Sequence, residues 1–501
     1  MTTLLTRPAL LLCGALCLGS ASAAPEAEPG LAIVVKPLVT AGQVSALDVR
    51  QQLTHGAPAG GALLRFNAPL ALYGVPVLAA KITGLQVSDA HGALPLTTED
   101  DPKQQGYTTA YRHWQATRPA VYPVTVQYRI GTELVTQSGP PFGMKPSGGG
   151  VAGNGLGFLL LPENTSSTAT RFSWDLSQLP AGAIGVITAG AGSVVVPGPP
   201  DAVLTQWMLA GPARVFTSTR TLGFQAYMLG EPPFDATAIL DWSDRAYAYL
   251  AASLVYLGAP PYRLFFRSLD APTYATGTAR PDGGGALMTV GPAFGKQTLG
   301  EFKNAIFHEM THQWVGMAPH AGAWFVEGLT TYLSAVMPCQ GGLESAQFCA
   351  DGVNKFADDY YGAEARNWSL EKIEVTPREE VRMVPYGRSL LYFGQLNAQL
   401  LAHSKGRRNV QDVVAQLFKA RAQGVEIDDA AWEAMLLREL GQGAVAEFRA
   451  SVIDGTTTIV PPADAFGPCL TRFKVAMAVK GTATKVHGYH WRPVACSKQN
   501  G

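Results

Sequence analysis

The sequence predicts a multidomain α+β protein, in which an N-terminal all-β sandwich region precedes a mainly helical region. Up to about residue 229, apolar and polar residues alternate in short runs between glycine and proline turns, as in residues 124–128. After Pro233 the apolar residues recur at helical spacing, interrupted by two strand candidates at residues 262–267 and 286–290. A chain of 501 residues is long enough for two or three such domains.

The first 23 residues have the features of a secretory signal peptide. Arg7 supplies a positive charge, residues 9–18 form a short apolar run, and Ala21-Ser22-Ala23 is a small-residue cleavage site. The apolar run is about half the length that a membrane span needs. We therefore expect a soluble mature protein in the periplasm or outside the cell. The remaining divisions are a β-sandwich region at 24–232, a helical domain at 233–455 and an irregular tail at 456–501.

The charge balance excludes one class of partner. Lys plus Arg and Asp plus Glu both number 38, so the formal net charge is zero. A chain without basic excess is not suited to electrostatic binding of nucleic acid or anionic lipid. No segment after the signal peptide reaches transmembrane length. The sequence does not indicate an oligomeric state.

Four cysteines remain in the mature chain and form two local pairs, Cys339 with Cys349 and Cys469 with Cys496. An even, locally paired set in an exported protein predicts two disulfides. Metal thiolates are the alternative, and the chain has no C-x-x-C spacing that would favour them.

The chemistry-bearing segment is His308-Glu309-Met310-Thr311-His312, an H-E-x-x-H motif. On a helix, two histidines four residues apart project from one face and can bind the same metal ion. The glutamate between them is placed to act as a general base.

The flanking residues predict that this motif lies inside a helix. Thr298 and Glu301 form a capping-box signature, and Gly316 offers a C-terminal stop. Phe302, Ile306 and other apolar residues at intervals of four give the helix a second, apolar stripe. We therefore expect the helix to be buried at the centre of its domain.

Two histidines leave a catalytic zinc site one protein ligand short. Position 318 is alanine, where one peptidase class would have a third histidine. His320 lies past the Gly316 stop, beside Pro319. Glu327 is the better candidate, because it begins the next helix after a short turn and lies off the apolar stripe of that helix.

Together these residues resemble a known family. His308-Glu309-x-x-His312-Gln313-Trp314 followed by Trp324-Phe325-x-Glu327-Gly328 is similar to the gluzincin metallopeptidases. Within them the likeness is nearest to the bacterial glycyl aminopeptidases, with the aminopeptidase N group a step further away. It is sharp over residues 302–333, weak through Tyr386 to about residue 455, and faint in the β region.

The resemblance implies a thermolysin-like catalytic domain with one Zn²⁺ bound by His308, His312 and Glu327. It also implies that Glu309 is the general base and that Tyr386 stabilises the tetrahedral intermediate. The substrate would be a peptide or protein. On this basis we interpret the chain as a secreted zinc-dependent metallopeptidase, and as an aminopeptidase if its specificity follows the family. Ligand type favours zinc over other divalent metals without enforcing it.

The likeness breaks at three places. The segment between His312 and Glu327 is short, and the tail cannot hold the PDZ module that glycyl aminopeptidases often carry. Aminopeptidases of this clan also place a glutamate before the metal helix to bind the free amine of the substrate. Here Met288 stands near that place, in a strand that we expect to pair with an extended peptide. Exopeptidase specificity is therefore open.

Two alternatives remain at this point. One is a zinc-binding protein of the same fold whose metal has become structural, which the missing acid favours. The other is hydrolysis of a non-peptide such as an epoxide, which rests on analogy within the clan alone.

Overall fold

The computed structural model describes residues 29–72, 75–76, 79, 81–102, 110–132, 142–269, 276–280, 283–291, 298–316, 322–376 and 379–496. The predicted signal peptide at residues 1–23 lies outside these ranges, and so does His320. Within them, no helix combines the length and the apolar character that crossing a membrane requires.

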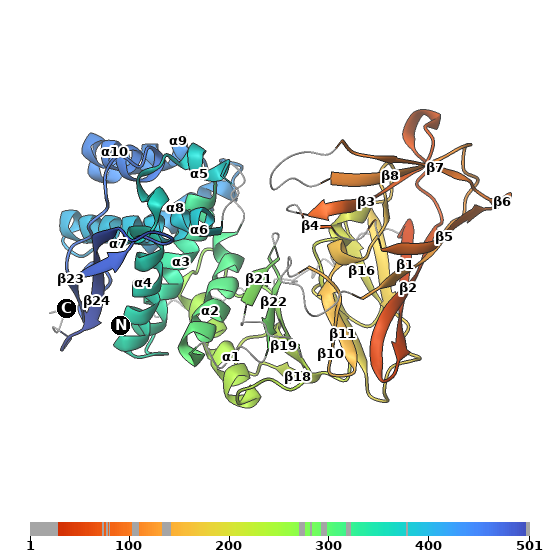
Figure 1. Ribbon diagram of the computed structural model, residues 1–501, viewed down its shortest axis with the longest axis horizontal. Coiled ribbons are helices and arrows are strands. Elements are labelled where there is room, and N and C mark those ends of the chain that lie inside the picture. Colours follow the sequence, from red (N-terminus) through yellow and green to blue (C-terminus); the bar gives the residue numbers. More distant parts are fainter. Residues whose placement is uncertain are drawn as a thin grey trace, which may run out of the picture.

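The N-terminal part is built from three β-sheets, on the right of Figure 1. Their orders are β16-β13-β1-β2-β9-β5-β6, β12-β3-β8-β7 with β4 beside β3, and β10-β11-β17-β14-β15. The strands are β1 (Leu31–Thr40), β2 (Gln43–Leu53), β3 (Arg65–Leu72), β4 (Val75–Pro76), β5 (Ile82–Asp89), β6 (Gly92–Ala93), β7 (Leu96–Asp100), β8 (Ala110–Ala116), β9 (Val124–Gly131), β10 (Lys145–Ser147), β11 (Gly150–Asn154), β12 (Leu161–Pro162), β13 (Ala169–Trp174), β14 (Ile184–Ile187), β15 (Gly190–Ala191), β16 (Val194–Pro197) and β17 (Trp207–Gly211).

The predicted alternation produces the core of this part. In β9, Val124, Val126, Tyr128 and Ile130 are buried while their neighbours face outward, which is the period-two pattern of a half-buried strand. Their side chains join one apolar cluster with residues of all three sheets. One pairing departs from the antiparallel expectation, since β1 and β13 run parallel.

A fourth sheet has the order β18-β19-β20-β22-β21 and combines residues from both sides of the predicted boundary at 232/233. That boundary stays a prediction. The strands are β18 (Arg214–Thr217), β19 (Phe224–Leu229), β20 (Tyr262–Ser268), β21 (Thr276–Ala279) and β22 (Gly285–Val290). β19, β20 and β22 are parallel, and the edge strand β21 is antiparallel to β22.

The two faces of this sheet contact different partners. Ala286 and Met288 of β22 belong to the cluster shared with the helices, whereas Leu287 packs against Trp207 of the β10-β11-β17-β14-β15 sheet. Both faces are therefore covered, as the nearly all-apolar sequence of β22 requires. Figure 1 shows the sheet between α2 and β10–β11.

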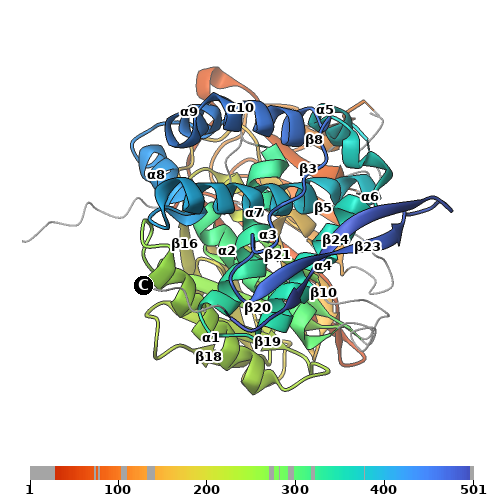
Figure 2. The same cartoon turned by 90° about the vertical axis from the view of Figure 1, so that its left-hand side faces the viewer.

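The helices pack on the other side of the fourth sheet, and Figure 2 views the molecule from their side. They are α1 (Ala236–Ser253), α2 (Leu299–Val315), α3 (Gly322–Gln340), α4 (Ala346–Tyr361), α5 (Leu370–Glu374), α6 (Glu379–Arg382), α7 (Val384–Ser404), α8 (Val410–Arg421), α9 (Asp429–Leu440) and α10 (Gln442–Phe448). Helix α3 is central because it packs against α2, α4 and α7. At Gly328, an added Cβ would lie 2.1 Å from the Ser389 Cβ, so α3 and α7 approach as closely as glycine permits.

The prediction of an irregular tail is wrong for the hairpin of β23 (Leu470–Ala478) and β24 (Lys485–Pro493). The hairpin is held on α4 by a reciprocal pair of bonds. Asn354 Nδ2 donates to the Trp491 carbonyl at 2.9 Å, and the Trp491 N–H donates to Asn354 Oδ1 at 2.7 Å. These two strands are therefore stabilised by packing on α4 rather than by a local sequence signal.

Both predicted disulfides are confirmed. Cys339–Cys349 joins the end of α3 to α4, and Cys469–Cys496 closes the base of the C-terminal hairpin.

Candidate metal centre

Helix α2 forms where the sequence predicts it. The Thr298 side chain accepts the Glu301 N–H at 3.1 Å, and Glu301 Oε2 accepts the Thr298 N–H at 2.7 Å, which completes the capping box. The apolar stripe, represented by Ile306 and Met310, is fully buried. This burial fixes the rotation of α2 and leaves the histidine-bearing face toward α3.

Three side chains from α2 and α3 converge on one point. His308 Nε2 lies 3.2 Å from His312 Nε2 and 3.3 Å from Glu327 Oε2, and His312 Nε2 lies 3.5 Å from the same oxygen. The three side chains are 11 to 27% exposed. In the described part of the chain, they are the one group of at least three His, Cys, Asp or Glu side chains close enough to share an ion.

The spacing of these atoms fits a metal ion. Zinc bonds of 2.0–2.2 Å at tetrahedral angles place neighbouring donor atoms about 3.3–3.6 Å apart, close to the 3.2, 3.3 and 3.5 Å found here. Two imidazole nitrogens and one carboxylate oxygen form a donor set that catalytic zinc sites use. The residues present could therefore hold zinc and leave one tetrahedral position without a protein ligand.

A threonine on α3 sets the orientation of His312. The Thr330 hydroxyl donates to the Val326 carbonyl at 2.7 Å and lies 3.4 Å from His312 Nδ1. Because the hydroxyl proton is engaged by the carbonyl, the Thr330 oxygen is left to accept from Nδ1–H. In this tautomer the lone pair of Nε2 points toward the other two donor atoms. A hydrogen bond to the second ring nitrogen, like that of Thr330 to Nδ1, is typical of metal-binding histidines.

The three groups also interact electrostatically. Burial raises the pKa of Glu327, but the charges and hydrogen bonds of His312 and His308 outweigh it and hold that pKa well below its usual range. Burial lowers the pKa of His312, and the Glu327 and Glu309 carboxylates reverse this and raise it. The Glu327 carboxylate therefore stays ionised, which is the form that binds a cation.

Glu309 lies beside the three-residue group and outside it. The Ala279 N–H of the edge strand β21 faces this carboxylate and slightly favours its ionised form. Burial raises the pKa of Glu309, and the neighbouring histidine charges oppose this in part. At Gly277 of the same strand, an added Cβ would lie 2.6 Å from Glu309 Cγ. Strand β21 therefore lies directly against this carboxylate.

Tyr386, in the first turn of α7, also reaches the site. Its ring stacks on His308 with the centroids 6.3 Å apart, and its hydroxyl lies close enough to the Glu327 carboxylate for that charge to act on it. Burial raises the pKa of Tyr386 above its usual value, so the phenol keeps its proton and can donate it in a hydrogen bond.

The expectation for Met288 is wrong. Strand β22, which contains it, is an inner strand paired with β20 on one side and β21 on the other, so no peptide can pair with it. Met288 itself is 0% exposed and packs among the helices. The open edge belongs to β21, a short strand that the sequence analysis missed. In the described part of β21 there is no acidic residue.

Thr330 was also missed. It stands three residues after Glu327. The spacing of three places Thr330 and Glu327 on one face of α3, which is the signal that could have pointed to Thr330.

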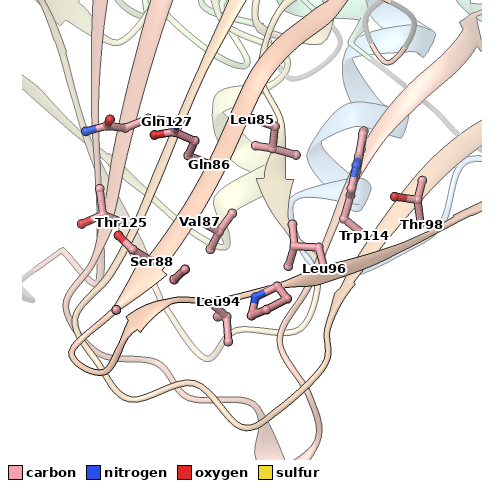
Figure 3. A pocket seen from close by; sticks show the side chains of 13 residues that line it. Leu85, Gln86, Val87, Ser88, Leu94, Leu96, Thr98, Trp114, Thr125 and Gln127 are labelled. Carbon is pink, nitrogen blue, oxygen red and sulfur yellow. The ribbon is translucent and has the colours of Figure 1, made fainter.

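A separate cavity of about 750 Å³ lies in the N-terminal part, between β5–β6 and β7–β8 (Figure 3). Its lining includes Val87, Leu94 and Trp114 and contains no histidine, cysteine or charged residue. Figure 1 shows these strands on the right, with the fourth sheet between them and α2 and α3. This cavity is therefore no part of the metal centre.

Several solved protein structures superimpose on this chain. An aminopeptidase N family protein from Idiomarina loihiensis superimposes with a TM-score of 0.67 at 14% identity, over 89% of this chain and 79% of that one. An M1 zinc metallopeptidase variant from Deinococcus radiodurans, bound to a Tyr-Ser-Ala substrate, gives a TM-score of 0.50 at 18% identity, over 86% and 94%. No protein-family model and no curated protein matches the sequence. At these identities the likeness establishes a shared multidomain α+β fold.

Proposed function

We propose that this chain is a secreted zinc-dependent metallopeptidase of the gluzincin type, with a thermolysin-like catalytic domain over residues 233–455. The observation that carries the proposal is the trio of His308, His312 and Glu327 at the spacing of one tetrahedral ion, with Glu309 beside it. The structural neighbours, an aminopeptidase N family protein and an M1 zinc metallopeptidase, support the same proposal.

The roles follow from position and chemistry. His308, His312 and Glu327 would hold a zinc ion, which would supply Lewis-acid chemistry at a peptide carbonyl and would lower the pKa of a water molecule. Glu309 takes the proton of the attacking water and delivers it to the leaving amine nitrogen, which a carboxylate next to the donors can do. Tyr386 donates a hydrogen bond to the carbonyl oxygen as its negative charge develops.

Strand β21 is the surface for the substrate main chain. The Arg280 N–H bonds inward to the Gly285 carbonyl at 2.8 Å, so the alternate residue Gly277 turns its N–H toward the open edge, and the Ala279 N–H on the same edge faces Glu309. An extended peptide can pair with such an edge. Since the described part of β21 has no acid for a free amine, the proposal does not extend to aminopeptidase specificity.

Metal removal tests the proposal. The mature chain, stripped with a chelator and assayed on internally quenched peptides with free and with blocked N-termini, is expected to be inactive. Equimolar zinc is expected to restore amide hydrolysis. Hydrolysis that persists without metal, or zinc-loaded protein that cleaves no peptide, would refute it.

A methyl group at Gly277 tests the contact between β21 and the general base. In Gly277→Ala the new Cβ would lie 2.6 Å from Glu309 Cγ and 2.7 Å from Met288 Cε. Either the strand or the carboxylate must move, and a shift of about 1 Å costs roughly 100-fold in rate. We expect kcat/KM to fall by about that factor while zinc content is unchanged.

The matched control is Gly443→Ala in α10, where an added Cβ meets nothing within 4 Å. It is expected to keep full activity. Equal activity of the two variants would show that β21 does not support Glu309.

A further inference from the structure

A glutamine of helix α2 holds the turn that joins β21 to β22. Gln313 Oε1 accepts the N–H of Gly284, and Gly283 beside it is buried with a φ of 77°. An added Cβ at Gly283 would lie 2.9 Å from Gln313 Oε1 and 3.0 Å from Nε2. The side-chain amide therefore packs directly on the backbone of this turn, at a position where only glycine leaves room.

The same face of α2 contacts β21 at a second point. Gln313 follows Glu309 by four residues, so both side chains project from one face of the helix. Glu309 Cγ lies against Gly277 of β21, whereas Gln313 lies against the turn beyond the last residue of the strand, Ala279. The edge strand is thus held on α2 at the proposed general base and again one helical turn further on.

The other side of the turn is fixed by the β-sheets. The Arg263 N–H of β20 donates to the Gly284 carbonyl at 2.9 Å, and Arg263 Nη1 donates to the Thr188 carbonyl at 2.7 Å. Thr188 directly follows β14 of the β10-β11-β17-β14-β15 sheet. Gly284 is therefore bonded through its carbonyl to the sheet side and through its N–H to Gln313, so the Gln313 side chain sets how closely the turn approaches α2.

We propose that Gln313 is a positioning residue, which sets the distance between the substrate main chain on β21 and the carboxylate of Glu309. The inference rests on the proposed peptidase function and deepens it. A peptide that pairs with the open N–H of Gly277 moves with the strand, whereas Glu309 and the two histidines stay on α2. Loss of the contact at Gly284 therefore displaces the scissile bond from the proton carrier and leaves the donor atoms for the metal in place.

Glutamine suits this position because its amide oxygen accepts a hydrogen bond without adding charge. A carboxylate would keep the acceptor but would add a second negative charge one helical turn from Glu309. A hydrocarbon side chain would leave the half-buried Gly284 N–H without its acceptor, which destabilises the turn. Conservative and disruptive replacements of Gln313 can therefore be told apart.

The test compares the mature zinc-loaded chain as wild type, Q313L, Q313N and Q313E. Q313L removes the acceptor, Q313N has an amide one methylene too short to reach Gly284, and Q313E keeps the acceptor. If one of the first two variants does not fold, the other decides. Q399L is the matched control, because Gln399 is a half-buried glutamine of α7 that donates to Glu447 of α10 at 2.7 Å.

Two quantities are measured. Amide hydrogen exchange at Gly284 reports the contact independently of activity, and kcat/KM on end-blocked peptides long enough to pair with β21 reports its effect. In Q313L and Q313N, exchange is expected to become about tenfold faster. Their kcat/KM is expected to fall by roughly 10- to 100-fold at unchanged zinc content. Q313E is expected to keep the slow exchange and most of the activity, and Q399L is expected to match wild type in both.

A double variant separates positioning of β21 from a general structural effect. Q313L and Gly277→Ala both displace β21 from Glu309, so their combined loss of kcat/KM is expected to be smaller than the product of the two single losses. A replacement that merely lowers the folded fraction would multiply with Gly277→Ala.

Three results overturn the inference alone. One is faster exchange in Q313L and Q313N with unchanged kcat/KM. The second is a loss of activity in any of the three Gln313 variants without faster exchange at Gly284. The third is a fully multiplicative double variant, which would mean that Gln313 does not act through β21. If zinc-loaded wild type cleaves no peptide, the proposed peptidase function itself is refuted, and the inference with it.

Discussion

Glu309→Gln is expected to lower kcat for peptide hydrolysis by about 10²–10⁴-fold while zinc stays bound, because an amide of the same shape cannot carry the proton. Glu309 lies outside the three-atom donor group and packs against β21 at Gly277. Its loss therefore removes a proton carrier and leaves the metal ligands intact. Single-turnover kinetics with parallel metal analysis measures both effects.

The control for this variant is Glu371→Gln, since Glu371 is an exposed glutamate on α5. It is expected to behave as wild type. Loss of zinc in Glu309→Gln would make Glu309 a ligand rather than a base. Retention of more than about a tenth of the activity would remove it from the mechanism.

Glu327→Ala is expected to weaken zinc binding by well over 100-fold and to abolish hydrolysis with it. The carboxylate provides the third donor atom, 3.3 and 3.5 Å from the two Nε2 atoms. Loss of an outer contact typically costs 10–100-fold in metal affinity, and loss of a direct ligand costs more. Competition against a chelator of known affinity measures the change.

Thr330→Val is the comparison for Glu327→Ala, because it removes an outer contact of a ligand instead of a ligand. It removes the acceptor for His312 Nδ1–H at 3.4 Å and keeps the volume of a fully buried side chain. Its zinc affinity is expected to fall by about 10–100-fold. If Glu327→Ala binds zinc as tightly as Thr330→Val does, Glu327 is not a ligand.

Much of the site could be predicted because its signals are local. The capping box and the Gly316 stop define α2, and the i, i+4 spacing places both histidines on one face. The following helix begins at Gly322, so Glu327 had to lie near α2. Short-range helix geometry therefore decides which side chains meet.

The edge strand could not be predicted in the same way. The four residues Thr276–Ala279 contain a glycine and an alanine and have no apolar alternation. Their place at the sheet edge depends on pairing with β22, and sequence gives no local signal for that order. Met288 was consequently assigned to the substrate side, although its strand is internal.

The C-terminal hairpin was missed for a related reason. Its anchors, such as the paired bonds between Asn354 and Trp491, join residues far apart in the chain. The disulfide between Cys469 and Cys496 was the one feature of this tail that spacing could indicate.

The central claim is that two imidazoles and one carboxylate bind a single ion. A crystal structure of the zinc-loaded protein, with an anomalous difference map at the zinc edge, tests it most directly. We expect one peak per chain, about 2.0–2.2 Å from Nε2 of His308, Nε2 of His312 and a carboxylate oxygen of Glu327. A peak elsewhere, or Glu327 turned away from it, would contradict the claim.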